Sequence, residues 1–229
     1  MRVALFGGSF NPPHVAHQLV ALYVIETAPV DELWFVPTFL HPFDKPLEPF
    51  GDRFHMCELA AAALGPRVRV SDIEAQMGGK SRTLRTVRGL MSQHPALAFS
   101  LVIGSDLVTE TESWYGGDEL RRLIPFIVVG RGSSPHTDFR GHRNAHTAVL
   151  DEFSGDVPVE VGGRAPKSPD AVSAAETPPG PHLPPVMPAV SSTEVRAVLG
   201  AGGNASALVP KSVLDYITSR GLYRSPRTS

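Results

Sequence analysis

The segment from Gly7 to His17, Gly-Gly-Ser-Phe-Asn-Pro-Pro-His-Val-Ala-His, constrains the fold of this chain more than any other. It directly follows Val3–Phe6, a short apolar run typical of a buried strand. Its two glycines let backbone come close to a ligand, and left-handed backbone costs them little. Its two prolines suit the start of a helix, and apolar residues recur at helical spacing from Val20 onward. The segment therefore predicts a strand, a glycine turn and a helix in close succession.

Two histidines fall at the start of the predicted helix. His14 and His17 are three residues apart, so they lie near the first turn and on one face. Unpaired N–H groups and the positive end of the helix dipole gather there, and both attract anions. The pattern favours a phosphate-binding site over a strand-turn-helix corner with two solvated histidines.

A second segment far downstream, Val-Ser-Ser-Thr-Glu-Val-Arg at residues 190–196, has matching chemistry. Ser191 and Glu194 have the spacing of a capping box, which by itself predicts only the start of a helix. Arg196 then lies early in that helix, where the dipole disfavours a cation unless an anion is present. With the hydroxyls of Ser191, Ser192 and Thr193, this guanidinium predicts a cradle for the β- and γ-phosphates of a nucleotide.

Composition excludes several classes of protein. The net charge is −2 and the isoelectric point is about 6.5, so no overall basic field indicates binding to nucleic acid or to an anionic membrane. No apolar run approaches the roughly 20 residues that span a bilayer, and no signal peptide is found. The single cysteine, Cys57, suits a reducing compartment and is expected to be an inert core thiol. We therefore expect a cytoplasmic location.

Short apolar runs alternate with helical patterns along the chain, which predicts a doubly wound parallel α/β sheet. We expect strands near 3–6, 32–36, 68–70, 99–103 and 126–129, and helices near 14–26, 52–64, 84–93 and 118–123. We expect a final helix to begin at Pro210 and to end at Gly221. Residues 132–188 are rich in Pro, Gly and Ser and predict a surface excursion with at most a short strand at 157–161. All of residues 1–229 are interpreted as one domain, with a helical part at 191–223.

The segments at residues 7–17 and 190–196 resemble signatures of the nucleotidylyltransferase superfamily. The first resembles the T/H-x-G-H signature in the form used by bacterial nicotinate-nucleotide adenylyltransferases, and the second resembles Ile-Ser-Ser-Thr-x-Ile-Arg. The triplet Gly104-Ser105-Asp106 is similar to the family's Gly-x-Asp, whose carboxylate accepts hydrogen bonds from ribose hydroxyls. The resemblance implies a Rossmann-like nucleotidylyltransferase fold and an ATP site formed by Gly7, Gly8, Ser9, Phe10, His14, His17, Asp106, Ser191, Ser192, Thr193 and Arg196.

Weaker matches indicate where the second substrate binds. Ser81–Thr86 falls where the family carries Ser-Tyr-Thr-x-Asp-Thr, which contacts the pyridine nucleotide. Trp114 falls where a family tryptophan stacks on the nicotinate ring. The resemblance implies acceptor binding by Lys45, Thr83, Thr86, Trp114 and Arg131.

The resemblance implies transfer of the adenylyl group from ATP to nicotinate mononucleotide, giving deamido-NAD and pyrophosphate. His17, His14, Lys45 and Arg196 are the implied catalytic residues. Phosphate around His17 is expected to favour its protonated, doubly donating form. Mg²⁺ is expected to bind through the ATP phosphates, and no metal-binding residues are expected. The sequence does not decide whether the protein forms a homo-oligomer.

Four departures from the family pattern leave the acceptor open. Asn11 replaces a common aspartate, Ala16 replaces the second signature glycine, and Arg82 and Arg85 replace a tyrosine and an aspartate. Nicotinate and nicotinamide mononucleotide, or another phosphorylated acceptor, therefore all stay open. Phosphopantetheine adenylyltransferase, a fragment of a class I aminoacyl-tRNA synthetase, and a non-enzymatic nucleotide sensor on the same fold stay in view as competing hypotheses.

Overall fold

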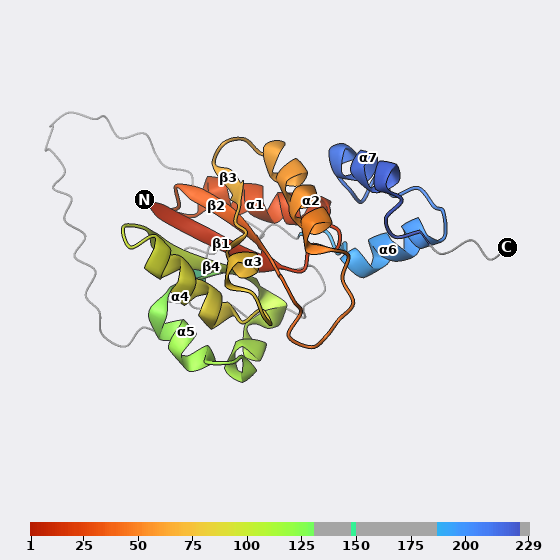
Figure 1. Cartoon of the computed structure of the whole chain (residues 1–229). Helices are drawn as coiled ribbons and strands as arrows, with labels where there is room; N and C mark the ends of the chain where they lie inside the picture. The colour runs from red at the N-terminus through yellow and green to blue at the C-terminus, as the bar shows by residue number, and fades with distance from the viewer. Residues whose placement is uncertain (131–147, 150–186, 225–229) are drawn as a thin grey trace, which may run out of the picture.

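Five parallel strands form the centre of the molecule in the computed structural model, which describes residues 1–130, 148–149 and 187–224 (Figure 1). Their spatial order is β3-β2-β1-β4-β5. The strands are β1 (Arg2–Gly8), β2 (Glu32–Pro37), β3 (Val68–Val70), β4 (Ala98–Gly104) and β5 (Phe126–Val129). All five predicted strands are confirmed to within two residues at each end.

A short sixth strand lies beyond the five parallel strands of the predicted sheet. A two-residue strand, β6 (Ala148–Val149), pairs antiparallel with β5. So short a run has no alternation of apolar and polar residues, so the sequence does not indicate it. The strand expected at 157–161 lies outside the described residues, as does most of the expected excursion.

Helices connect the parallel strands, as the alternating pattern predicts. The elements are α1 (Val15–Thr27), α2 (Phe50–Ala62), α3 (Ile73–Met77), α4 (Thr83–Gln93), η1 (Ser105–Leu107), η2 (Thr109–Ser113), α5 (Gly117–Leu123), α6 (Ser192–Gly200) and α7 (Lys211–Arg220). The predicted helices are confirmed to within two residues, and α7 ends at Gly221 with the left-handed backbone expected there. The short elements α3, η1 and η2 were not predicted.

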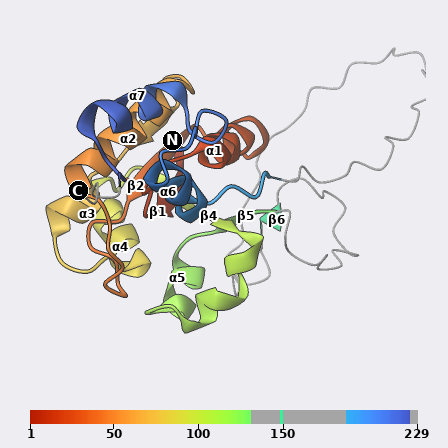
Figure 2. The same ribbon diagram turned by 90° about the vertical axis from the view of Figure 1, so that its right-hand side faces the viewer.

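The helices cover both faces of the sheet, which confirms the doubly wound arrangement. Successive residues of a strand point to opposite faces. Accordingly Ala4 and Phe6 of β1 pack in the core that includes residues of α1 and α2, whereas Val3 and Leu5 pack against α4 and α5. Figure 2 shows the strands in a row, with α1 and α2 above them and α4 and α5 below.

A third apolar cluster packs the C-terminal helices against α2. Met56 and Ala60 of α2 pack with Val195 of α6 and with Val213 and Ile217 of α7. In Figure 2, α6 lies in front of the strands, near the labels of β1 and β2. The start of α6 is thereby placed beside the loop that follows β1.

The cysteine behaves as the sequence predicts. Cys57 is fully buried in the core between α2 and the sheet, and burial raises the pKa of its thiol. It is therefore an inert core thiol. In the part of the chain that the structure describes, no helix is both long enough and apolar enough to cross a membrane.

Candidate active site

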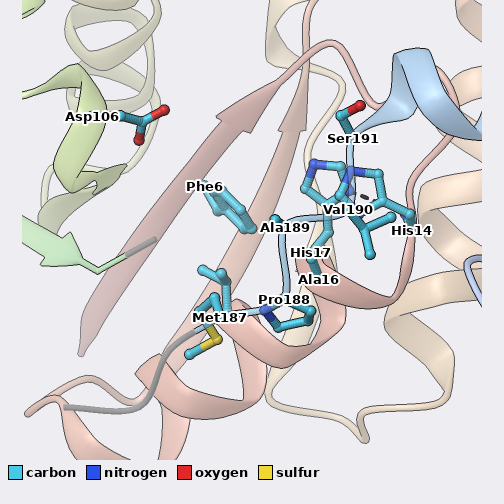
Figure 3. Close-up of a pocket in the computed structure, with 11 residues that line it drawn as sticks. Phe6, His14, Ala16, His17, Asp106, Met187, Pro188, Ala189, Val190 and Ser191 are labelled. Carbon is cyan, nitrogen blue, oxygen red and sulfur yellow. Dashed lines mark hydrogen bonds between the residues drawn. The ribbon is translucent and has the colours of Figure 1, made fainter. Parts of the chain in front are cut away.

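A cleft of about 220 Å³ opens at the ends of β1 and β4 (Figure 3). Ligands of doubly wound folds bind beyond the carboxyl ends of the strands, where this cleft lies. Its lining includes residues from both signature segments and from the turn after β4: Phe6, His14, Ala16, His17, Val20, Asp106, Met187, Pro188, Ala189, Val190 and Ser191. Segments from opposite ends of the chain therefore contribute to one cavity.

The two histidines stack on each other at the start of α1. Their ring centroids are 3.7 Å apart and the ring planes differ by 26°. His14 is the N-cap residue and is buried, whereas His17 is partly exposed in the first turn. In Figure 3 the paired rings and the Asp106 carboxylate lie on either side of Phe6. The helix begins at Val15, within one residue of the predicted start, and Pro12 and Pro13 precede its N-cap residue.

A hydrogen bond fixes the proton arrangement of His17. The backbone N–H of His14 donates to Nδ1 of His17 over 3.1 Å. A nitrogen that accepts a hydrogen bond carries no proton, so the neutral ring has its proton on Nε2. That phosphate around His17 favours its protonated form stays a prediction. Because the backbone already donates to Nδ1, His17 can present a single donor, Nε2–H.

The Phe10 ring packs against the His17 ring. Its ring is buried and meets the rings of His17, Phe6 and Phe35 edge-on, with centroid distances of 4.9, 5.7 and 5.2 Å. Phe10 has a φ of 44°, a left-handed conformation that costs a bulky residue about 1 kcal/mol or more. Since its side chain is enclosed, only the backbone of Phe10 is placed to meet a ligand.

The signature glycines act differently from the expectation. The left-handed residue of this turn is Phe10, and neither glycine has a positive φ. A Cβ on Gly7 would point into open space, so this position leaves room for a ligand beside the strand end. A Cβ on Gly8 would come within 3.1 Å of the Phe10 ring, so the ring would have to shift by a few tenths of an ångström to admit it.

Helix α6 is tied to the β1–α1 loop by side chains of the second signature. The Ser192 hydroxyl donates to the Pro12 carbonyl over 2.9 Å, and the Arg196 guanidinium donates to the Asn11 carbonyl over 2.7 Å. Ser191 caps the helix by accepting the N–H of Glu194, as predicted. A second guanidinium nitrogen of Arg196 donates to the Thr193 hydroxyl. The two signatures are thus bound to each other.

These bonds change which donors can meet a phosphate. The Ser192 hydroxyl already donates its proton to Pro12, so it does not offer that proton to a ligand in this structure. Among the described residues, Arg196 donates two of its five N–H groups, and the other three remain for a ligand. At α1 the N–H of Val15 donates to the Leu208 carbonyl, so fewer backbone donors are available there than the sequence indicated. At the start of α6 the N–H groups of Ser192 and Thr193 precede the capped N–H of Glu194, and they add backbone donors to those of Arg196.

A buried arginine that sequence reasoning did not place in the site holds the same loop. Arg53 is 1% exposed and donates to the carbonyls of Ser9, Phe39 and Glu48 over 2.8 to 3.2 Å. It therefore joins the turn after β1 to the loop after β2. A lone arginine in a helical pattern gives no sequence signal of this role.

Tyr223, near the C-terminal end of the described chain, also holds the β1–α1 loop. The Tyr223 hydroxyl donates to the Asn11 side-chain oxygen over 2.8 Å, and that oxygen also accepts the N–H of Glu48. An amide oxygen has the two lone pairs that this double acceptance needs. Burial raises the pKa of Tyr223 above its ordinary value.

The segments assigned to the acceptor lie next to each other but outside the lining of the cleft. The Arg82 guanidinium lies over the Tyr115 ring, 5.6 Å from its centroid. A Cβ on Gly116 would overlap Leu84, which shows how closely the start of α4 meets the Trp114 loop. Thr83 and Trp114 are partly exposed at this junction.

Two residues of the acceptor segment have interior partners. The Thr86 hydroxyl is buried and donates to Glu74 over 2.8 Å. The Arg85 guanidinium donates to the carbonyls of Met77 and Gly78, where it satisfies the end of α3. Lys45 is exposed on the loop after β2 and does not line the cleft. Arg131 lies outside the described residues.

No dense metal cage is found where the structure can be described. Among those residues, no three His, Cys, Asp or Glu side chains gather closely enough to hold an ion. Asp106 is the carboxylate of the cleft lining. This donor set fits a magnesium ion that is carried by nucleotide phosphates and keeps several waters.

Comparison with known proteins places the chain among nucleotidyl-transferring enzymes. A cytidylyltransferase-like family model matches residues 5–198. A protein of Anaeromyxobacter dehalogenans named "Probable nicotinate-nucleotide adenylyltransferase" is 39% identical over 225 residues, covering 97% of this chain and 96% of that protein. A protein of Myxococcus xanthus with the same name is 32% identical over 228 residues, covering 100% of this chain and 97% of its own length.

Solved structures share the fold. The nicotinic acid mononucleotide adenylyltransferase of Plasmodium falciparum, complexed with NaAD, superposes with a TM-score of 0.71. It is 21% identical and the match covers 97% of each chain. At this identity the likeness supports the Rossmann-like fold alone.

Proposed function

The chain belongs to the cytidylyltransferase-like family and, within it, to the nicotinate-nucleotide adenylyltransferases, and from this premise we propose that it joins ATP and nicotinate mononucleotide. The products are deamido-NAD and pyrophosphate. We treat residues 1–229 as one nucleotidylyltransferase domain, because α6 and α7 share an apolar core with α2. A cytoplasmic location is part of the proposal, since one buried thiol suits a reducing compartment.

One observation carries the proposal. The stacked His14 and His17 of the first signature, Ser191 of the second and Asp106 after β4 line the same cleft at the strand ends. A helix start, a second helix start and a strand-end carboxylate are the groups that recognise phosphates and a ribose. The relatives' names supply the identity of the acceptor.

The proposed reaction needs positioning more than proton abstraction. The phosphate monoester of the acceptor is largely a dianion at neutral pH, because its second pKa is about 6. Its oxygen attacks the α-phosphorus of ATP, and the bond to the β-phosphate oxygen breaks. Catalysis then comes from holding attacker and leaving group in line and from stabilising the charge that develops on the phosphates.

His17 is the proposed donor to the transition state. With Nδ1 occupied by the His14 N–H, its Nε2–H is the group that donates to an α-phosphate oxygen. His14 stacks on it and steadies the nucleotide phosphates. In the proposal, Asp106 accepts hydrogen bonds from the ribose, and the open side of Gly7 takes the nucleotide close to the backbone.

The leaving pyrophosphate is assigned to α6. The first backbone N–H groups of the helix and the three unused N–H groups of Arg196 are its proposed donors. Ser192 contributes by fastening the helix to Pro12. Magnesium, when bound with ATP, neutralises phosphate charge. Lys45 and Arg131 remain proposed as further cations near the reacting groups.

Arg82 favours an acidic acceptor. It lies beside Tyr115 and next to Trp114, the proposed partner of the pyridine ring. A guanidinium binds the nicotinate carboxylate more strongly than the neutral nicotinamide amide, because only the carboxylate carries the opposite charge. Arg85 adds no such selectivity, because its guanidinium binds the end of α3. We therefore infer a preference for nicotinate mononucleotide.

Incubation with ATP, magnesium and nicotinate mononucleotide tests the proposal, with the dinucleotide product identified by mass spectrometry. We expect deamido-NAD and an equal amount of pyrophosphate. Nucleotide binding without any product would instead favour the non-enzymatic sensor. Product from phosphopantetheine alone would move the chain to another acceptor class.

A further inference from the structure

The carboxylate of Glu74 lies at the meeting point of three segments around the acceptor side. It belongs to α3, which connects β3 to the Lys80–Ser81 turn, and it is 8% exposed. One oxygen accepts the backbone N–H of Phe39 over 3.0 Å and the hydroxyl of Ser81. The other accepts the hydroxyl of Thr86 over 2.8 Å. All of these partners are neutral donors.

The loop after β2 runs beside the Lys80–Ser81 turn at this point. The N–H of Ser81 donates to the Leu40 carbonyl over 2.9 Å, and Leu40 forms a parallel bridge with Lys80. The Phe39 N–H also lies 3.0 Å from the Ser81 hydroxyl oxygen. Glu74 therefore joins the loop after β2, the turn before α4 and the first turn of α4.

A carboxylate suits this place better than an amide. Burying a charge is costly unless hydrogen-bond donors or an opposite charge satisfy it. Three neutral donors contact the Glu74 carboxylate, and the buried Arg53 guanidinium lies near enough to attract it electrostatically. A glutamine would offer one acceptor oxygen and would turn its NH₂ group toward hydroxyl donors. The Glu74 carboxylate therefore accepts hydrogen bonds from the Ser81 and Thr86 hydroxyls that an apolar or amide side chain could not both accept.

We propose that Glu74 is a positioning residue for the mononucleotide acceptor, acting through Thr86, Ser81 and Phe39. This inference rests on the proposed function, which assigns Ser81–Thr86 to the acceptor. It also reassigns Thr86: its hydroxyl orients α4 through Glu74 instead of contacting the acceptor. Arg53 holds the Phe39 and Ser9 carbonyls through hydrogen bonds of its own, and these bonds stay in place when the Glu74 carboxylate becomes an amide.

Steady-state kinetics of Glu74→Gln test the proposal, with Glu58→Gln as the control because Glu58 is an exposed carboxylate on α2. We expect the acceptor KM to rise about tenfold in Glu74→Gln, the change that one lost buried hydrogen bond produces. The ATP KM should stay within about twofold, and Glu58→Gln should match the wild type. An equal rise in both KM values, or no rise in the acceptor KM, would overturn the proposal.

If Glu74→Gln does not fold, a second pair of variants, at Thr86, tests whether the hydrogen bond between Thr86 and Glu74 positions the acceptor site. Thr86→Val removes the hydroxyl donor and should raise the acceptor KM, whereas Thr86→Ser keeps the donor and should restore it. Where Glu74→Gln folds, the double variant Glu74→Gln/Thr86→Val should raise the acceptor KM by less than the two single effects combined. Both changes break the same hydrogen bond, from the Thr86 hydroxyl to Glu74. Additive effects, or failure of Thr86→Ser to restore the KM, contradict the proposal. All KM values are measured with the acceptor that the wild-type protein uses, so a different acceptor overturns the proposed function and leaves this test intact.

Discussion

Nδ1 of His17 lies 3.1 Å from the backbone nitrogen of His14 and accepts its N–H. The stacked rings and this bond fix how His17 faces the cleft. With Nδ1 accepting this bond, Nε2 is the ring nitrogen that can donate a proton to a ligand in the cleft. The same imidazole therefore serves as a cap of α1 and as the proposed donor to the reacting phosphate.

His17→Asn separates these two roles. The asparagine side-chain oxygen can accept the His14 N–H, but the amide does not reproduce the donor of Nε2. We expect a loss in kcat of about a hundredfold or more, with the ATP KM changed only slightly. Steady-state kinetics and a melting curve measure both roles. His55→Ala, on the exposed face of α2, is the control, and equal losses in kcat and in ATP affinity would exclude a transition-state role.

Arg53→Lys should destabilise the protein although charge is conserved. A lysine amine is a point charge on a flexible stem and cannot reach three carbonyls on separate loops as the guanidinium does. We expect the free energy of unfolding to fall by about 2 to 4 kcal/mol, because buried carbonyls lose their donors. Denaturant titration measures it, with the exposed Arg122→Lys as the control. A change equal to that of the control would show that the contacts of Arg53 carry no stability.

Tyr223 should make the folded state sensitive to alkali. Burial raises the pKa of its hydroxyl, so at high pH the unfolded chain releases this proton while the folded chain retains it. Stability is therefore complete below the ordinary tyrosine pKa of about 10 and falls as the pH rises above it. Tyr223→Phe should lose less stability than the wild type between pH 9 and about 11. Parallel pH dependences of the two proteins would contradict this role.

The acceptor preference should depend on Arg82 and not on Arg85. Arg82→Gln removes the cation beside Tyr115 and should reduce the ratio of kcat/KM for nicotinate over nicotinamide mononucleotide by about tenfold. Arg85→Gln should leave this ratio unchanged and lower the melting temperature, since it frees the carbonyls of Met77 and Gly78. An equal effect of the two variants on the ratio would show that general charge, and not the position of Arg82, sets the preference.

The strands and long helices could be predicted because their apolar residues repeat with the period of each element. The short elements could not, since α3 covers five residues and never completes a second turn. The sequence also indicated that both signatures meet at one site. It did not show that Ser192 and Arg196 bind the loop of the first signature, because hydrogen bonds between distant segments produce no periodic pattern in the sequence.

Individual roles within the turn were harder to foresee. The glycines drew attention as residues for left-handed backbone, yet Phe10 adopts it, because three packed rings enclose its side chain. The buried roles of Glu74 and Arg53 could not be foreseen, since a lone charged residue in a helical pattern is usually solvated. Their importance follows from burial, which only the three-dimensional structure shows.

Pyrophosphate release from ATP and magnesium, measured side by side with nicotinate mononucleotide, nicotinamide mononucleotide and phosphopantetheine, tests the central claim most directly. We expect rapid release with nicotinate mononucleotide, a much lower kcat/KM with its amide, and none with phosphopantetheine. ATP binding without release from any of the three would contradict an adenylyltransferase built on His17 and α6.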